Sequence, residues 1–354
     1  MPERGRTAKR VVGKEGARRR RPTLEDVAAR AGVSRALASI VMRGAAGASE
    51  ATRQRVLAAA GDIGYRPDAR ARLLASGHSR QLGVVFLMSG RFHLELLDGL
   101  YGAADAAGYE LLLSALTPSR DEQRAVETLL DFRCEAVIQL GPGLGPPVLA
   151  GRLPVVVIGW AVDDPAVDVI RTSDDEGMRQ AVDHLVGLGH QHITHIDGGA
   201  GVIADARRKA YRAAMRHHRL GRHARTVAGG VLQRDGVAAA KLLLDRGSLP
   251  SAVIAFNDDV AAAMLETFLR AGVAVPRDIS IVGWDDTALA RLPHLDLTTV
   301  RQDVDEMARL AVQRSVARLS TDSIPHREVI LSPELLVRGS TAPPRGDRRD
   351  ATGQ

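Results

Sequence analysis

Cysteine and aromatic residues are scarce in this 354-residue chain, which contains one cysteine and 3% aromatic residues. One cysteine excludes an intramolecular disulfide framework and a four-cysteine metal site. Cys134 lies just before the apolar run Ala136–Ile138, so we expect a small buried side chain without a redox role. The histidines of residues 184–195 lack the spacing of a zinc motif, so we expect neither a metal nor a cofactor. They are His184, His190, His192 and His195.

Long apolar runs are absent as well. No segment approaches the ~20 apolar residues that a membrane-spanning helix needs. Residues 1–22 are basic, but they contain no apolar segment like that of a secretory signal. We therefore expect a cytoplasmic protein without a membrane partner.

Charge is distributed unevenly along the chain. Residues 1–80 contain 18 Lys and Arg against 7 Asp and Glu, whereas the remaining 274 residues contain 30 against 35. A basic N-terminal part on a mildly acidic body is typical of a nucleic-acid-binding domain joined to a soluble core. A solvated basic tail on an unrelated protein would explain residues 1–22, which we expect to be a disordered arm. Such a tail accounts less well for the arginines that continue from residue 23 to residue 80.

Residues 23–64 have the pattern of three short helices. Thr23 is placed to cap the first helix with Asp26 as its reciprocal partner, and Gly32 is placed to end it. Ser34 is placed to cap the second helix. Ser49 opens the third, whose predicted apolar face is Val56, Leu57, Ala60 and Ile63.

From residue 82 the pattern changes to apolar runs that alternate with helical segments. The predicted strands are Leu82–Met88, Glu110–Ala115, Ala136–Leu140, Val155–Gly159, Ile193–Asp197, Ala252–Phe256 and Ile279–Gly283. The predicted helices include 93–107, 120–132, 176–188, 236–246, 258–271 and 303–319. Continuous apolar strands joined by helices predict an α/β fold of two doubly wound parallel-sheet lobes. A ligand is then expected between the lobes, at the carboxyl ends of the strands.

Two short helices joined by a glycine-containing turn are typical of a helix-turn-helix, whose second helix enters the major groove. On that helix Val33, Ala38 and Val41 are expected to face inward. The residues expected to face DNA, where arginine and serine can reach base edges or phosphates, are Arg35, Ala36, Ser39 and Arg43.

The segment that follows, residues 67–79, has the composition of a hinge helix. Arg70 and Arg72 could contact phosphates, and Leu74 could insert between base pairs from the minor groove. A plain interdomain linker is the alternative for this segment.

Other classes of protein fit the sequence less well. A periplasmic sugar-binding protein would need a signal peptide and no basic head. An enzyme is not expected, because nothing places a nucleophile or base beside the acidic pairs, such as Asp258-Asp259 and Asp285-Asp286. The glycine-rich runs at 141–145 and 198–201 lack the residues of a phosphate-binding loop and of a dinucleotide fingerprint. We expect both to be loops that leave strands, the second near the ligand.

Several ordered blocks together resemble the LacI/GalR family of bacterial regulators. The resemblance covers all but the basic arm and about the last dozen residues. The matching blocks are Thr23–Ala28, Ala31–Ser34, Thr52–Val56, Gly64–Pro67, His184–His190, Phe256–Asp258, Val275–Asp286, Leu297–Gln302 and Pro333–Thr341.

The resemblance implies a homodimeric transcriptional regulator, expected to be a repressor, on a near-palindromic double-stranded DNA operator. It implies a helix-turn-helix domain (23–66), a hinge (67–79), an effector-binding and dimerisation core (80–341) whose two lobes resemble periplasmic binding proteins, and a disordered tail (342–354). The tail has no leucine heptad, which favours a dimer over a tetramer. The resemblance also implies DNA contacts for Thr23, Ser34, Ile40 and the hinge residues, and effector contacts for Arg91, Phe92, Asp174, Arg207, Asn257 and Asp285.

The chain departs from the family pattern in two places. Ile40 stands where relatives commonly have a base-reading arginine, which predicts a nonstandard operator, or a head without sequence preference. Around the pocket, the extra Arg91 and the loss of aromatic residues, as at Val231 and Val304, favour a sugar acid or phosphorylated metabolite over a plain sugar.

Overall fold

The computed structural model describes residues 22–66, 78–88, 90–141, 152–321 and 325–345. The chain separates into two compact units, residues 1–78 and residues 79–354, which we describe one at a time. We call the first unit the head and the second the core. In these described ranges, no helix combines the length and apolar character that crossing a membrane requires.

The head contains α1 (Leu24–Ala31), α2 (Arg35–Met42) and α3 (Glu50–Asp62). The predicted capping box is confirmed: Asp26 N donates to Thr23 Oγ1, and Thr23 N donates to Asp26 Oδ2 at 2.7 Å. Gly32 ends α1 in the left-handed region with φ 65°, as predicted. Ser34 and Ser49 also cap α2 and α3 as predicted.

One side of each head helix forms a small hydrophobic core of Val27, Ala28, Ala38, Val41, Val56 and Ala60. The prediction that Leu57 shares the buried face of α3 is wrong, because its side chain is 49% exposed. Val56 and Ala60 are four residues apart and share one face, whereas Leu57 is rotated by about 100° from Val56 around the helix axis.

The first lobe of the core is a parallel sheet with helices on both faces. Its strand order is β11-β5-β4-β3-β1-β2. The strands are β1 (Gln81–Leu87), β2 (Glu110–Leu116), β3 (Ala136–Leu140), β4 (Val155–Ile158), β5 (Val167–Thr172) and β11 (Glu328–Leu331). Helices α5 (Arg91–Ala106) and α11 (Val304–Arg318) cover one face, and α6 (Glu122–Asp131) covers the other.

The second lobe repeats this architecture with the strand order β12-β10-β9-β8-β6-β7, in which only β12 is antiparallel. Its strands are β6 (Ile193–Ile196), β7 (Arg225–Val227), β8 (Ala252–Ile254), β9 (Ser280–Asp285), β10 (Thr298–Arg301) and β12 (Glu334–Leu336). Helices α7 (Asp174–Gly187) and α8 (Val202–His217) pack on one face, and α9 (Gln233–Asp245) and α10 (Asp258–Arg270) on the other. A short 3-10 turn, η1 (Gly221–His223), precedes β7.

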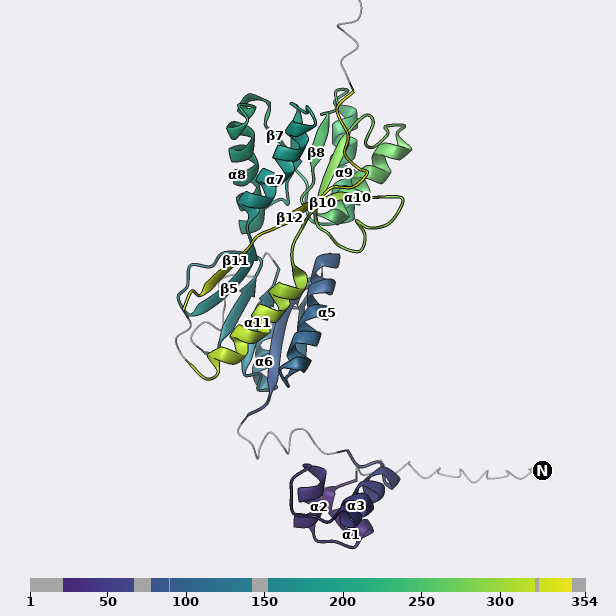
Figure 1. The fold of residues 1–354 in the computed structure, drawn as a ribbon, viewed down its shortest axis with the longest axis vertical. Coiled ribbons are helices and arrows are strands. Elements are labelled where there is room, and N and C mark those ends of the chain that lie inside the picture. Colours follow the sequence, from purple (N-terminus) through teal and green to yellow (C-terminus); the bar gives the residue numbers. More distant parts are fainter. Residues whose placement is uncertain (1–21, 67–77, 89, 142–151, 322–324, 346–354) are drawn as a thin grey trace, which may run out of the picture. The chain divides into compact units, whose positions relative to one another are not determined.

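Among the described elements, the chain crosses between the lobes three times: between β5 and α7, between β10 and α11, and between β11 and β12. The late helix α11 consequently lies beside the early helix α5 (Figure 1). Ser173 N donates to Leu331 O at 2.9 Å, so two crossings are joined by a hydrogen bond. The two-lobe α/β fold predicted from the sequence is confirmed.

The sequence did not predict β5, because Asp168 interrupts its apolar pattern. Asp168 is fully buried and paired with Arg314 Nη1 at 3.1 Å and Arg318 Nε at 2.6 Å, which compensates its charge. The predicted disordered tail also begins too early. Residues 342–345 still contact the core, because Ala342 N donates to Ser280 Oγ and Arg345 pairs with Asp278.

Candidate functional site

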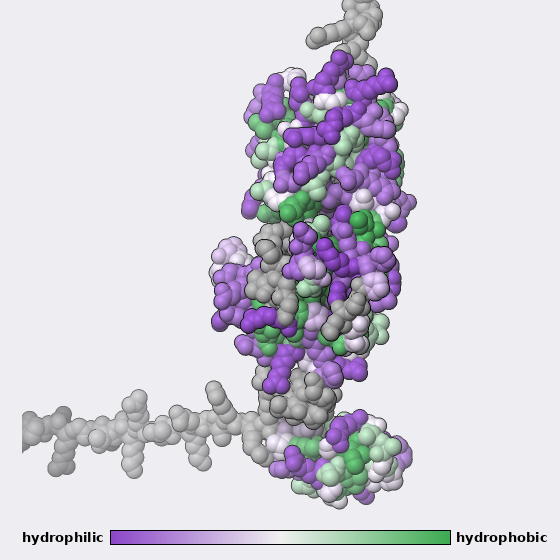
Figure 2. Space-filling view, turned by 90° about the vertical axis from the view of Figure 1, so that its left-hand side faces the viewer, coloured by the Kyte–Doolittle hydropathy of each residue, from purple (hydrophilic) through white to green (hydrophobic). Residues whose placement is uncertain are grey.

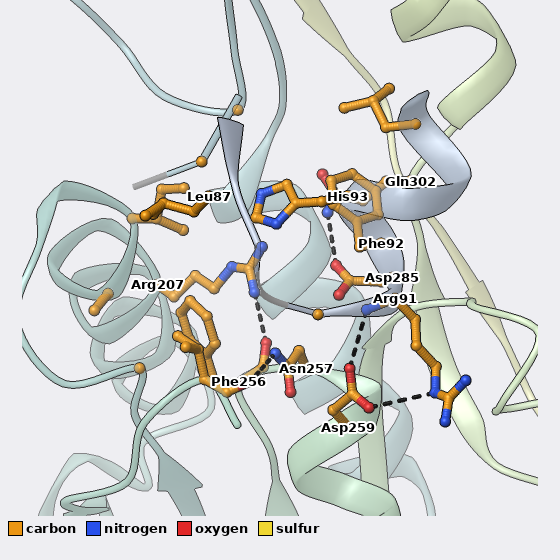
Figure 3. A pocket seen from close by; sticks show the side chains of 18 of the residues that line it. Leu87, Arg91, Phe92, His93, Arg207, Phe256, Asn257, Asp259, Asp285 and Gln302 are labelled. Carbon is orange, nitrogen blue, oxygen red and sulfur yellow. Dashed lines mark hydrogen bonds and ion pairs between the residues drawn. The ribbon is translucent and has the colours of Figure 1, made fainter. Parts of the chain in front are cut away.

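A cavity of about 270 Å³ lies between the two lobes of the core (Figure 3). The start of α5 lines it from the first lobe, and α8 together with the ends of β8 and β9 lines it from the second. Five of the six predicted effector contacts line this cavity: Arg91, Phe92, Arg207, Asn257 and Asp285. Gly198 and Ala200 also line it, as expected for the loop that leaves β6.

Arg207, on α8, is a buried cation held from several sides. Its Nε donates to Asp174 Oδ1 at 2.9 Å, and its Nη1 donates to Phe256 O at 2.6 Å. Its guanidinium carbon lies 4.7 Å from the Phe256 ring centroid, within cation–π range. Among the described residues, Nη2 has no acceptor and is therefore available to a ligand.

Asp174 itself does not line the cavity. It is the first residue of α7, and its side chain is 14% exposed. Its carboxylate fixes the orientation of Arg207 and compensates the charge of the guanidinium. The structure therefore places Asp174 behind Arg207 rather than at the cavity surface.

Asp285 ends β9 and brings a carboxyl group to the cavity. Its φ of 113° lies where side-chain-bearing residues are rare, a strain that clusters at functional sites. Oδ1 accepts a hydrogen bond from Gln302 Nε2 at 2.8 Å. Burial raises the pKa of Asp285 well above its usual value, and the nearby Arg207 opposes this rise. Because Gln302 lies in the crossing between β10 and α11, this bond ties the cavity to an interlobe segment.

Asn257 and Asp258 hold the adjoining backbone. Asn257 caps α10 by accepting from Val260 N at 2.9 Å, and its Nδ2 donates to Val231 O at 2.9 Å. Asp258 is buried and accepts hydrogen bonds from Thr299 Oγ1 and from both Thr287 N and Oγ1. Burial raises the pKa of Asp258 to about 7, although these hydrogen bonds lower it. These contacts show that both side chains serve the local fold.

Arg91 does not present a free cation to the cavity. Its Nε lies 3.5 Å from Asp259 Oδ1, its backbone N donates to Asp259 Oδ2 at 3.2 Å, and its side chain is 51% exposed. Figure 3 shows its guanidinium pointing away from Arg207 and toward Asp259. Arg91 therefore gives no support to the expected preference for an acidic or phosphorylated ligand, because a carboxylate of the other lobe already pairs with it.

His93, Phe256 and Gln302 are among the lining residues that sequence reasoning missed. His93 is two residues from the predicted Arg91, and Phe256 and Gln302 lie inside blocks that match the family pattern, so proximity to predicted contacts and to these blocks was the available signal. Val231 also lines the cavity, whereas Val304 lines a second cavity of about 460 Å³ that shares Asp285 and Gln302 with the first.

In the head, the structure shows which predicted DNA contacts are accessible. Arg35, Ala36 and Arg43 are exposed, and Ser39 and Ile40 are half-buried on the same helix. Thr23 and Ser34 use their hydroxyl groups for capping. The predicted hinge residues Arg70, Arg72 and Leu74 lie outside the described residues.

Comparisons with known proteins agree with this two-part organisation. Residues 23–68 match the sequence profile of bacterial regulatory proteins of the lacI family, and residues 182–341 match that of a periplasmic binding protein-like domain. The ribose operon repressor of Escherichia coli is 31% identical over 90% of this chain and 99% of its own length. The chain belongs to the LacI family. It is a DNA-binding transcriptional regulator.

Solved structures of LacI-family proteins also resemble the chain. A LacI transcriptional regulator from a Rhodococcus species is 41% identical, with a TM-score of 0.71 over 74% of this chain and 98% of that chain. The lac repressor dimer bound to operator and the anti-inducer ONPF is 27% identical, with a TM-score of 0.81 over 91% of this chain and all of that chain. In this LacI-family chain, the family resemblance thus extends over both the head and the core.

Proposed function

We propose that this regulator is a homodimeric repressor of a near-palindromic operator and that a small molecule in the interlobe cavity changes its operator affinity. One observation carries the proposal: both lobes supply side chains to the same cavity, Phe92 and His93 from the first and Arg207 and Asp285 from the second. A ligand that contacts both lobes favours one interlobe geometry, and it shifts the equilibrium by its difference in affinity for the two states.

Direct contacts between the lobes hold the interlobe geometry that a ligand would favour or disfavour. Asp259, on α10, pairs with Arg91, on α5, and Ala288 N donates to Glu95 Oε1 at 2.8 Å. Both contacts are at least partly exposed, so each contributes little alone. Weak contacts of this kind allow the lobes to change their relative position at a modest energetic cost.

The charges around the cavity favour a neutral polyhydroxylated effector, such as a sugar. Arg207 and Arg91 are each paired with a carboxylate, whereas Asp285 also lines the cavity. A phosphate would lie beside the Asp285 carboxyl group, and both arginines among the described lining residues are already paired with carboxylates. A hydroxyl group, in contrast, can accept from Arg207 Nη2 and bond to the Asp285 carboxyl group, while Phe92 and Phe256 provide apolar surface. The named relative is a ribose operon repressor, which is consistent with a sugar.

We assign the cavity a binding role without catalysis. The two carboxylates among the described lining residues are already bonded within the protein, Asp259 to Arg91 and Asp285 to Gln302. Arg207 and Asp285 are held by hydrogen bonds within the protein, as expected for groups that recognise a ligand.

The exposed edge of the first lobe supports the homodimer. β2 is the end strand of its sheet, and the adjacent α5 exposes Leu94 at 64% and Tyr101 at 48%. Leu94, Leu97 and Leu113 line an open groove to which Leu232 and Gln233 of the second lobe also contribute. An edge strand flanked by apolar side chains is a surface that proteins cover, here with a second copy of the chain. The lac repressor structure is itself a dimer bound to operator.

A matched pair of variants tests the dimer. Leu94→Glu should convert the protein to a monomer in analytical ultracentrifugation and weaken operator binding at least tenfold. Ile330→Glu is the control, because Ile330 is 49% exposed on β11, at the opposite edge of the same sheet. Equal sedimentation of both variants and the wild type would overturn this interface.

The function is tested by selecting bound sequences from a random duplex pool at about 0.15 M salt, where phosphate attraction does not dominate. We expect an inverted repeat. The recovered operator is then titrated with protein in the presence of neutral sugars, sugar acids and sugar phosphates. A neutral sugar should change the operator affinity, whereas a response only to the anionic compounds would contradict the proposed effector class.

A further inference from the structure

The outer side of α2 carries three adjacent apolar side chains that the head does not use for its own folding. Ala36 is exposed, Leu37 and Ile40 are half-buried, and none of the three belongs to the hydrophobic core of the head. Ala36 and Leu37 precede Ile40 by four and three residues, so all three lie next to one another on the helix surface. We call this set the α2 apolar patch. Figure 2 shows hydrophobic residues (green) at the surface of the head.

The loop after α2 supports Ile40 from one side. A Cβ atom built on Gly47 would lie 3.8 Å from Ile40 Cγ2, and Gly47 has a φ of 122° that a side chain rarely adopts. Ala45 N donates to Ile40 O at 3.1 Å, which holds the loop against the end of the helix. The Ile40 side chain is therefore positioned by the loop and still partly accessible.

The charge around the patch identifies DNA as its partner. Arg35 and Arg43 are exposed at the two ends of α2, and α2 contains no acidic residue. Arg35 Nε lies 3.7 Å from Glu25 Oε1, but both side chains are more than 70% exposed, so this pair is weak and leaves Arg35 available to phosphates. A surface with cations at both ends and an apolar centre complements phosphates on either side of a base edge.

We propose that Ile40, with Ala36 beside it, contacts the C5-methyl group of a thymine in each operator half-site. This inference rests on the proposed function, because it requires α2 to enter the major groove of an operator. Thymine alone among the unmodified bases presents a methyl group there. An isoleucine cannot satisfy the hydrogen-bonding groups of the other base edges, so it favours thymine by burial and disfavours the alternatives by desolvation.

The size of the effect follows from the area of one methyl group. Burial of one methyl group changes affinity by about fourfold. A dimer makes the contact twice, so loss of both methyl groups should weaken operator binding by about fifteenfold. Binding to nonspecific DNA should not change, because the patch contains no group that bonds a phosphate.

The experiment uses the full-length protein and the inverted repeat recovered from the random pool. Each thymine of the half-site is replaced in turn by deoxyuridine, which removes only the C5-methyl group. Affinities are measured by fluorescence anisotropy for the wild type, Ile40→Ala and Leu57→Ala. Leu57 is the control, because it is an exposed apolar residue of the same head on α3.

One thymine position should respond by about fifteenfold in the wild type and in Leu57→Ala when both half-sites are replaced. Ile40→Ala should bind the thymine and deoxyuridine operators equally, with unchanged salt dependence and unchanged melting temperature of the head. Two results would overturn the methyl contact but leave the operator function intact. In the first, no deoxyuridine substitution changes the affinity of the wild type for the inverted repeat. In the second, Ile40→Ala still binds the thymine operator more tightly than the deoxyuridine operator. Recovery of no motif would overturn the proposed operator function as well.

Discussion

The guanidinium carbon of Arg207 lies 4.1 Å from the centroid of the Trp284 ring. Trp284 is fully buried on β9, directly before Asp285, and Arg207 lines the interlobe cavity. A ligand that bonds to Arg207 therefore changes the charge environment of a buried indole. The interlobe site has a spectroscopic reporter within its own structure, and this relationship leads to the first prediction.

Ligand binding should change the tryptophan fluorescence of the protein. A saturating effector, found by screening unmodified aldoses, should shift the intensity or the emission maximum, because a ligand bonded to Arg207 changes the electrostatic environment of the Trp284 ring. Trp284→Phe should remove most of this change. Trp160→Phe should keep it, although Trp160 is also buried. A change carried entirely by Trp160 would show that the ligand does not engage Arg207.

Arg207→Ala should abolish the effector response and also destabilise the core. The substitution leaves the Asp174 carboxylate and the Phe256 carbonyl without their donor, which should lower the free energy of unfolding by about 3 kcal/mol in urea titrations. Arg208→Ala is the matched control, because its partners Asp197 and Asp205 lie outside the cavity lining. Dimerisation without ligand should persist in both variants. A normal response in Arg207→Ala would mean that the effector binds elsewhere.

Arg91→Ala should have little effect on effector affinity. The Arg91 side chain is half-exposed and paired with Asp259, so its removal should change the dissociation constant by no more than about fivefold. Isothermal titration with the effector at two salt concentrations measures this directly. A hundredfold or larger loss of effector affinity would instead support the anionic effector that the sequence suggested.

Acid should destabilise the core partly through His195. Burial lowers the pKa of His195 to about 4, from an ordinary value of 6.5. The unfolded chain therefore binds more protons than the folded chain between these two values, and stability is lost as the pH falls from 6.5 through 4. At pH 5 the loss should be about 2 kcal/mol relative to pH 8.

The variant His195→Gln isolates this contribution. In urea titrations at pH 8 and pH 5, its loss of stability should be about 2 kcal/mol smaller than that of the wild type. His192→Gln serves as the control, because the His192 side chain is exposed. His192 directly precedes Ile193, the buried first residue of β6. If the stability of His195→Gln and that of the wild type depended identically on pH, the acid-induced loss of stability would not come from His195.

Local patterns in the sequence were sufficient for the head. Thr23, Ser34 and Ser49 cap helices whose bounds depend on hydrogen bonds within a few residues, and Gly32 adopts the conformation that glycine favours. The apolar runs similarly predicted the central strands of both sheets, since a strand covered by helices on both faces is apolar throughout. Such features need no knowledge of distant contacts.

Elements that depend on distant residues escaped the sequence. β5 contains a buried aspartate that is tolerated only because two arginines of α11 reach it from about 150 positions away. The short strands β11 and β12 lie on either side of the third crossing, and each pairs with a strand that is distant in the sequence, β11 with β5 and β12 with β10. The interlobe location of the cavity was predicted from the sequence. That His93 and Gln302 line it was seen only in the tertiary structure.

The sequence by itself determined the family, the helix-turn-helix head and the pair of α/β lobes, because each is encoded by periodicity and short motifs. The tertiary structure decided how the charges of the interlobe site are used. Arg91, Asp174 and Arg207 all carry charge in the sequence, but their pairings across long separations leave Arg207 Nη2 facing the cavity and occupy Arg91 with Asp259. Electrostatic partners are set by distance in space, which the order of residues along the chain does not contain.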